Sequence, residues 1–165
     1  MKLIEHIPLF KQMEIINRLH FFKEFTLSER QVLLESFGLL YLVSQHQFLF
    51  KQYDNDKRLY IVLSGALLVF KHNHLLELGT IEPGEFIGEG AFINNRERST
   101  SARAKTDTIV LAITPEALTR LPNVIREKIK DRIPDDEAIE FAELYGDRFK
   151  TITDFSKYNK HKSIS

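Results

Sequence analysis

Short apolar runs separated by turn residues dominate the middle of the chain, from Leu39 to Ile113. The runs recur at intervals of about ten residues, and their spacing is typical of strands rather than helices. Turn residues punctuate them at Asp54-Asn55-Asp56, Ser64-Gly65 and Pro83-Gly84. The pattern predicts eight strands, near residues 39–43, 47–50, 58–63, 66–71, 74–81, 85–87, 99–104 and 107–113.

Both ends of the chain show helical spacing instead. Over residues 9–36, apolar residues such as Phe10, Met13 and Ile16 recur three or four positions apart. Thr26 and Glu29 have the spacing of a capping box that would begin a second helix there. We therefore expect an N-terminal helical segment, 1–36, before a β core, 37–114.

Prolines mark the helices that follow the core. Thr114-Pro115 has the form of an N-cap followed by proline in the first turn, and Pro122 begins another helix. Pro134 ends that helix and precedes a last one, so that C-terminal helices fill residues 115–149. Residues 150–165 are polar and basic, which predicts a flexible tail. The fold class is mainly β with flanking α, an eight-stranded β-roll or jelly roll.

Composition removes several classes of function. The 165 residues carry 23 basic and 23 acidic side chains, so no basic excess favours nucleic-acid binding. There is no cysteine, which excludes disulfides and thiolate metal sites and suits the cytoplasm. No apolar run of about 18 residues occurs, so we expect no membrane-spanning helix.

The stretch Phe86–Ala104, FIGEGAFINNRERSTSARA, holds the candidate chemistry. Gly88 and Gly90 allow the backbone to approach a ligand closely, and a short helix beginning at Glu89 would leave amide groups free for an anion. Arg98 can bind two phosphate oxygens with its guanidinium. A carboxylate at Glu89 suits sugar hydroxyls beside that phosphate. The stretch therefore predicts a pocket for a small anionic phosphate ester.

This stretch resembles the phosphate-binding cassette of cyclic-nucleotide-binding domains, and it matches the cassette without a gap. The residues that carry the match are Gly88, Glu89, Ala91, Arg98, Ser99 and Ala104. LYIVLSGALLVF, residues 59–70, is similar to the family's strand–Gly–strand signature, and FIGE and ERS look closest to the bacterial catabolite-activator ligand-binding domain. The resemblance covers residues 21–121.

The resemblance implies a role for each cassette residue. Glu89 would bind the ribose 2′-hydroxyl, and Arg98 with Ser99 would hold the cyclic phosphate. The full set of candidate ligand-binding residues is Gly88, Glu89, Gly90, Ala91, Arg98, Ser99, Thr100 and Ser101. The ligand would be cyclic AMP or cyclic GMP, with no cofactor and no metal.

The chain departs from the family pattern in the cassette and in one loop. The family usually has a glycine where this chain reads Gln52-Tyr53-Asp54, so the resemblance does not fix the shape of that loop. Glu97 stands where proline is frequent before the arginine. Gly90 replaces a larger apolar residue, which would loosen the cassette helix.

Three structural alternatives stay open. Arg98 could pair with Glu89 or Glu97 in a site that binds nothing. Ile125, Ile129 and Ile133 form a helical stripe that could cover the barrel or close over the base, and Phe141, Leu144 and Tyr145 are other candidates for a lid. Gly65, His72, His74, Glu77 and Gly84 mimic a cupin metal motif, but no second motif follows.

No catalytic constellation is visible, so we expect a binding module rather than an enzyme. No basic recognition helix follows the core, which argues against direct DNA regulation. The prediction is a stand-alone cyclic-nucleotide sensor whose C-terminal helices change on ligand binding and signal to a protein partner or within a homodimer. The alternative is a degenerate cyclic-nucleotide-binding fold that serves only protein–protein contact.

Overall fold

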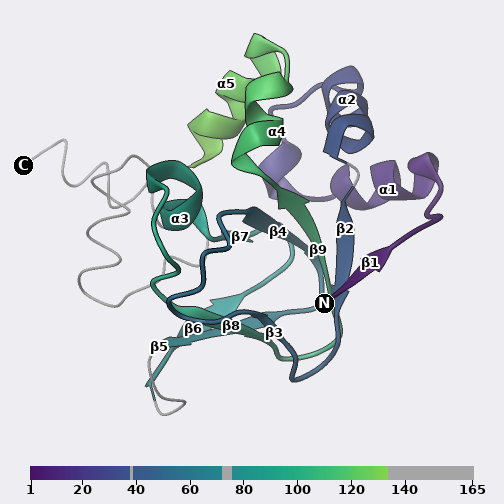
Figure 1. Ribbon diagram of the computed structural model, residues 1–165. Helices are drawn as coiled ribbons and strands as arrows, with labels where there is room; N and C mark the ends of the chain where they lie inside the picture. Colours follow the sequence, from purple (N-terminus) through teal and green to yellow (C-terminus); the bar gives the residue numbers. More distant parts are fainter. Residues whose placement is uncertain (38, 72–75, 134–165) are drawn as a thin grey trace, which may run out of the picture.

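Two antiparallel sheets form the centre of the computed structural model, which describes residues 1–37, 39–71 and 76–133 (Figure 1). The first sheet has the strand order β1-β2-β9-β4-β7: Lys2–Ile4, Leu40–Val43, Thr108–Ile113, Leu59–Ser64 and Phe86–Ile87. The second has the order β3-β8-β5-β6: Phe48–Phe50, Ser101–Ala104, Leu67–Lys71 and Leu76–Ile81. The predicted β-roll with flanking helices is confirmed, and all eight predicted strands are present.

A ninth strand was not predicted. β1 pairs with β2 in the register Leu3↔Tyr41, at the edge of the first sheet. It is only three residues long and mostly exposed, so its sequence lacks the apolar alternation that marks a half-buried strand. The residues of β2 that pair with it lie 36 to 40 positions further along the chain, so a local sequence pattern cannot predict this strand.

The helices lie on the outer side of the first sheet, opposite the second sheet (Figure 1). They are α1 (Leu9–Ile16), the 3₁₀ turn η1 (His20–Phe22), α2 (Leu27–Phe37), α4 (Pro115–Arg120) and α5 (Asn123–Arg132), while α3 (Glu89–Asn94) follows β7. The first sheet is therefore buried on both faces. In β4, Leu59 and Ile61 pack against the helices, whereas Tyr60 and Val62 face the second sheet. This explains why the strand is a continuous apolar run.

Thr26 and Thr114, the two residues predicted to cap helices, both do so. The Thr26 amide donates to a Glu29 carboxylate oxygen at 2.8 Å, and the Glu29 amide donates to the Thr26 hydroxyl at 3.2 Å. The Ala117 amide donates to the Thr114 hydroxyl at 3.0 Å, with Pro115 in the first turn. The predicted last helix and the tail lie outside the described residues.

The isoleucine stripe of α5 covers the barrel. Ile125, Ile129 and Ile133 are buried in one cluster with Phe22 and Leu33 of the N-terminal segment. The structure thus favours the packing role over the lid role for this stripe. The other lid candidates, Phe141, Leu144 and Tyr145, lie outside the described residues.

Tyr53 adopts a left-handed backbone conformation, with φ of 75°, in the loop between β3 and β4. This is the loop in which the sequence lacks the glycine expected from the resemblance. Left-handed backbone is strained for a bulky residue and free of strain for glycine. The loop therefore keeps a turn that glycine would favour, at a cost in backbone strain.

We predict that the strain at Tyr53 is measurable by comparing Tyr53→Ala with Tyr53→Gly. Both variants lose the ring, so their difference reports the backbone alone. Glycine is expected to give the more stable protein by about 1 kcal/mol in urea unfolding, because alanine also resists positive φ.

The matched control is Glu127, exposed in the middle of α5. There Glu127→Gly should be less stable than Glu127→Ala by about 1 kcal/mol, since glycine disfavours helix. Equal stabilities of the two Tyr53 variants, or an alanine variant that is more stable, would show that this position is unstrained.

Candidate functional site

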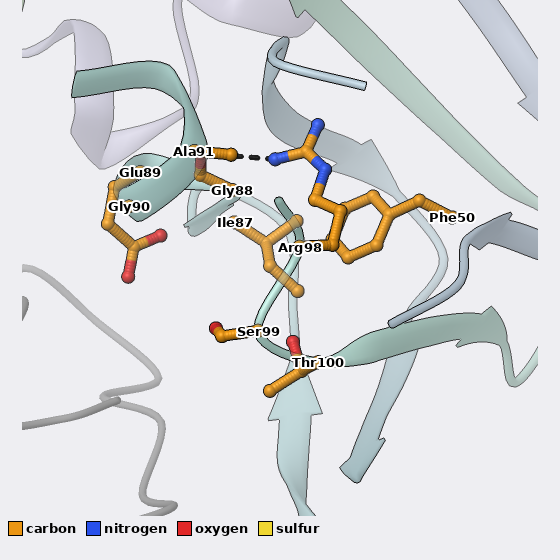
Figure 2. Close-up of a pocket in the computed structure, with 9 residues that line it drawn as sticks. All are labelled: Phe50, Ile87, Gly88, Glu89, Gly90, Ala91, Arg98, Ser99 and Thr100. Carbon is orange, nitrogen blue, oxygen red and sulfur yellow. Dashed lines mark hydrogen bonds between the residues drawn. The ribbon is translucent and has the colours of Figure 1, made fainter. Parts of the chain in front are cut away.

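A hollow of about 270 Å³, open to solvent at its mouth, lies where three segments meet (Figure 2). The segments are the end of β3, the β7–α3 junction and the loop that precedes β8. Its lining consists of Phe50, Ile87, Gly88, Glu89, Gly90, Ala91, Arg98, Ser99 and Thr100.

Gly88 makes the close packing of the site possible. Its φ of 98° is left-handed, and a Cβ at this position would lie 2.4 Å from Nη1 of Arg98 and 2.8 Å from the Arg58 carbonyl oxygen. Its own carbonyl accepts hydrogen bonds from Nη1 of Arg98 at 3.2 Å and from the Phe92 amide at 3.1 Å. Only glycine lets the arginine come this near to the start of α3.

Arg98 is buried, with 2% of its surface exposed, and reaches toward Gly88 (Figure 2). Its Nη2 donates to the Arg58 carbonyl at 2.6 Å, and its guanidinium carbon lies 4.1 Å from the centre of the Phe50 ring. Burial lowers the pKa of this guanidinium, which the nearby Asp56 carboxylate opposes. Its Nε is buried and has no hydrogen-bond partner, so one donor of a buried cation remains unsatisfied.

Two loops hold the backbone of Arg98 in place. Its amide donates to the Asp54 carbonyl at 2.9 Å, and its carbonyl accepts from the Tyr53 amide at 2.8 Å. The amide of the preceding residue, Gln52, donates to the hydroxyl of Ser101, the first residue of β8, at 2.8 Å. The β3–β4 loop and the loop before β8 are thus joined along the side of the hollow, and the left-handed turn at Tyr53 is part of that join.

Asp56 contacts Arg98 but does not line the hollow. Its carboxylate is 3.4 Å from Nη2 of Arg98 and 2.9 Å from Nε of Arg58, and it accepts a hydrogen bond from the Tyr60 hydroxyl. Burial works against the charged form, yet these donors hold the pKa of Asp56 below its usual value. The carboxylate therefore stays ionised beside the arginine.

Arg98 pairs with neither of the carboxylates considered from the sequence. Figure 2 shows the Glu89 carboxylate pointing away from the Arg98 guanidinium, although Glu89 is itself only 1% exposed. Within the described part of the chain the ion pair of Arg98 is with Asp56, and Glu97 takes no part in it. Neither an Arg98–Glu89 nor an Arg98–Glu97 ion pair therefore occurs among the described residues.

The known protein family that matches this chain is the cyclic nucleotide-binding domain, over residues 42–123. Those residues belong to the cyclic nucleotide-binding domain family. The match spans the two sheets from β2 onward, the cassette and α4, and so confirms the resemblance drawn from the sequence. A comparison with curated proteins found no match.

Solved structures share this fold. A cyclic nucleotide-binding domain from Methylobacillus flagellatus KT superposes with a TM-score of 0.65 at 22% identity, covering 84% of this chain and 80% of that one. The Thermus thermophilus catabolite activator protein gives 0.60 at 28% identity, with 76% and 60% covered. The regulatory domain of Toxoplasma gondii PKA, crystallised with cAMP, gives 0.61 at 16% identity, with 75% and 49% covered.

The cyclic nucleotide-binding domain brings most of the predicted site residues together. Seven of the eight line the hollow; Ser101 does not, and its hydroxyl instead holds the Gln52 amide. Phe50 and Ile87 line it as well and were missed. Ile87 directly precedes Gly88, which could have indicated it, whereas Phe50 comes from a separate strand and only the pairing of β3 with β8 brings it near.

The described residues give no support to the alternative of a cupin-like metal site. His72 and His74 lie outside the described residues. In the described ranges, up to residue 133, no three or more His, Asp or Glu side chains are grouped so as to hold a metal ion. Nor does any helix in those ranges have the length and apolar character needed to cross a bilayer.

We predict that Gly88→Ala lowers the free energy of unfolding by more than Gly84→Ala does. Both glycines have positive φ, at 98° and 88°, but a Cβ at Gly84 would have no neighbour closer than 3.6 Å. Both variants should lose about 1–2 kcal/mol from backbone strain. Gly88→Ala should lose about 1–3 kcal/mol more, because its Cβ displaces Arg98.

Urea unfolding of the two variants measures this difference. If Gly88→Ala were no less stable than Gly84→Ala, the close approach of Arg98 to the start of α3 would not exist in solution.

Proposed function

We propose that the hollow binds a cyclic nucleotide, cyclic AMP or cyclic GMP, with the unpaired Nε of Arg98 as a donor to the phosphate. The Nε of Arg98 is a buried donor without a hydrogen-bond partner, which is rare in folded proteins, and its side chain lines the hollow, so a ligand oxygen there would satisfy it. Hydrogen bonds from an arginine to a phosphate are short, directional and stronger than neutral ones. This single observation carries the proposal.

The charges around Arg98 support an anion with one negative charge. Within the cluster of Arg58, Arg98 and Asp56, two guanidinium groups share one carboxylate, which leaves an excess of one positive charge in that cluster. The Glu89 carboxylate also lines the hollow but points away from Arg98. Arg58 is 27% exposed and partly compensated by water, whereas Arg98 is not. A phosphodiester, which carries one negative charge, would complete the set.

Glu89 supports a sugar beside that phosphate. Its carboxylate accepts hydrogen bonds only, so it disfavours a second anion and favours hydroxyl groups. It lies on the first residue of α3 and points away from Arg98, which separates the hydroxyl-binding and phosphate-binding parts of the site. Two structures that share this fold are described with cAMP, one of them the T. gondii regulatory domain.

We further propose that the protein acts as a sensor rather than as an enzyme. Ligand binding at α3 would shift the helices that follow β9, and the changed surface would signal to a protein partner or a second copy. α5 is the described helix best placed to respond, because its isoleucines join the same core as Phe86 and Phe92, which flank the hollow-lining segment.

Titration calorimetry with cyclic AMP and cyclic GMP tests the binding claim. Wild-type protein is expected to bind at least one of them, and Arg98→Lys, which keeps the charge but loses the fork, should raise Kd about tenfold or more. Arg120→Ala, on the exposed last turn of α4, is the matched control and should leave Kd unchanged.

Linear 5′-AMP distinguishes the proposed ligand from any phosphate ester. Linear 5′-AMP should bind more weakly than the cyclic diester, because Arg98 is the one cation among the lining residues and the Glu89 carboxylate repels a second negative charge. No heat with either cyclic nucleotide at high micromolar wild-type protein would refute the proposed function.

A further inference from the structure

Asp56 contacts the Arg98 guanidinium, and Tyr60 contacts Asp56; neither residue lines the hollow. Oδ1 of Asp56 accepts from the Arg58 amide at 3.1 Å and from its Nε at 2.9 Å. Oδ2 accepts from the Tyr60 hydroxyl and lies 3.4 Å from Nη2 of Arg98. Both oxygens are thus occupied, and the carboxylate, 19% exposed, is fixed in one orientation.

The Arg98 side chain is held at both terminal nitrogens. Nη2 lies between the Arg58 carbonyl, at 2.6 Å, and the Asp56 carboxylate. Nη1 is held by the Gly88 carbonyl at 3.2 Å. Because a guanidinium is planar, fixing two of its nitrogens also fixes the direction of the third, and the third is the unpaired Nε.

Tyr60 connects this arrangement to the rigid part of the fold. It is fully buried in β4, the strand between β9 and β7, and its ring lies 6.0 Å from that of Phe50. Burial and the Asp56 carboxylate raise the pKa of the Tyr60 hydroxyl, so it remains a donor. A loop carboxylate alone could move with its loop, but one bound to a central strand cannot.

We propose that Asp56, held by Tyr60, is a positioning residue that sets the direction of the Arg98 Nε–H. It would act on the ligand only through Arg98, since neither Asp56 nor Tyr60 lines the hollow. The Arg58 carbonyl also accepts a hydrogen bond from Nη2 of Arg98, so the Asp56–Arg58 segment would position this nitrogen through two contacts. This inference rests on the proposed function for its effect on affinity, but not for its effect on Arg98 itself.

A double-mutant cycle on the affinity for cyclic AMP tests whether Asp56 acts through Arg98. The variants are Asp56→Asn, Arg98→Lys and the double variant, measured by calorimetry. Asp56→Asn should raise Kd about tenfold. In the Arg98→Lys background, which has no Nε–H to direct, Asp56→Asn should change Kd by less than about twofold.

Tyr60→Phe removes only the hydroxyl that holds Asp56. It should raise Kd about threefold in the wild-type background and have no further effect on Asp56→Asn. Two results would overturn the proposal: an Asp56→Asn Kd within twofold of wild type, or single-variant effects that multiply in the double variant. The urea midpoint of each variant shows whether it is folded under the conditions of the titration.

A second measurement needs no ligand and so separates this inference from the proposed function. The side-chain Nε–H signal of Arg98 in a ¹H–¹⁵N spectrum can be assigned by its loss in Arg98→Lys. In Asp56→Asn and in Tyr60→Phe this signal should shift or broaden, while that of Arg120 should not. An unchanged signal in both variants would refute the positioning role whether or not the protein binds a nucleotide.

Discussion

The burial of one guanidinium against main-chain carbonyls is the constraint on which the site depends. Arg98 is removed from water, so its donors must be satisfied by groups that are fixed in place. Backbone carbonyls of Gly88 and Arg58, from two different segments, satisfy its terminal nitrogens. The remaining donor, Nε, has no hydrogen-bond partner, and its direction follows from the groups that hold the two terminal nitrogens.

Two residues around the buried Arg98 have the positive φ that is typical of glycine. Gly88 has to lack a side chain because the guanidinium occupies the place of its Cβ. Tyr53 adopts positive φ at the point where its amide donates to the Arg98 carbonyl. Backbone strain at such a position is a feature that recurs at binding sites, where the surrounding contacts hold it.

The spacing of residues in the sequence was sufficient to predict the strands and the helix cap. Turn residues at regular intervals predicted eight strands, and Thr26 with Glu29 predicted a capping box, because each pattern reports neighbours within a few residues. The partner of Arg98 could not be found in this way. Asp56 lies in a loop more than forty residues earlier, and only the pairing of β4 with β7 brings that loop beside the cassette. Phe50 and β1 were missed for the same reason.

The central claim is that the Arg98 Nε–H is the donor that a cyclic phosphate satisfies. A crystal structure of the protein with cyclic AMP tests it most directly. We predict that Nε lies within hydrogen-bond distance of a phosphate oxygen while the terminal nitrogens keep the Gly88 and Arg58 carbonyls. A bound nucleotide whose phosphate contacts other groups, with Nε still unpaired, would contradict the account.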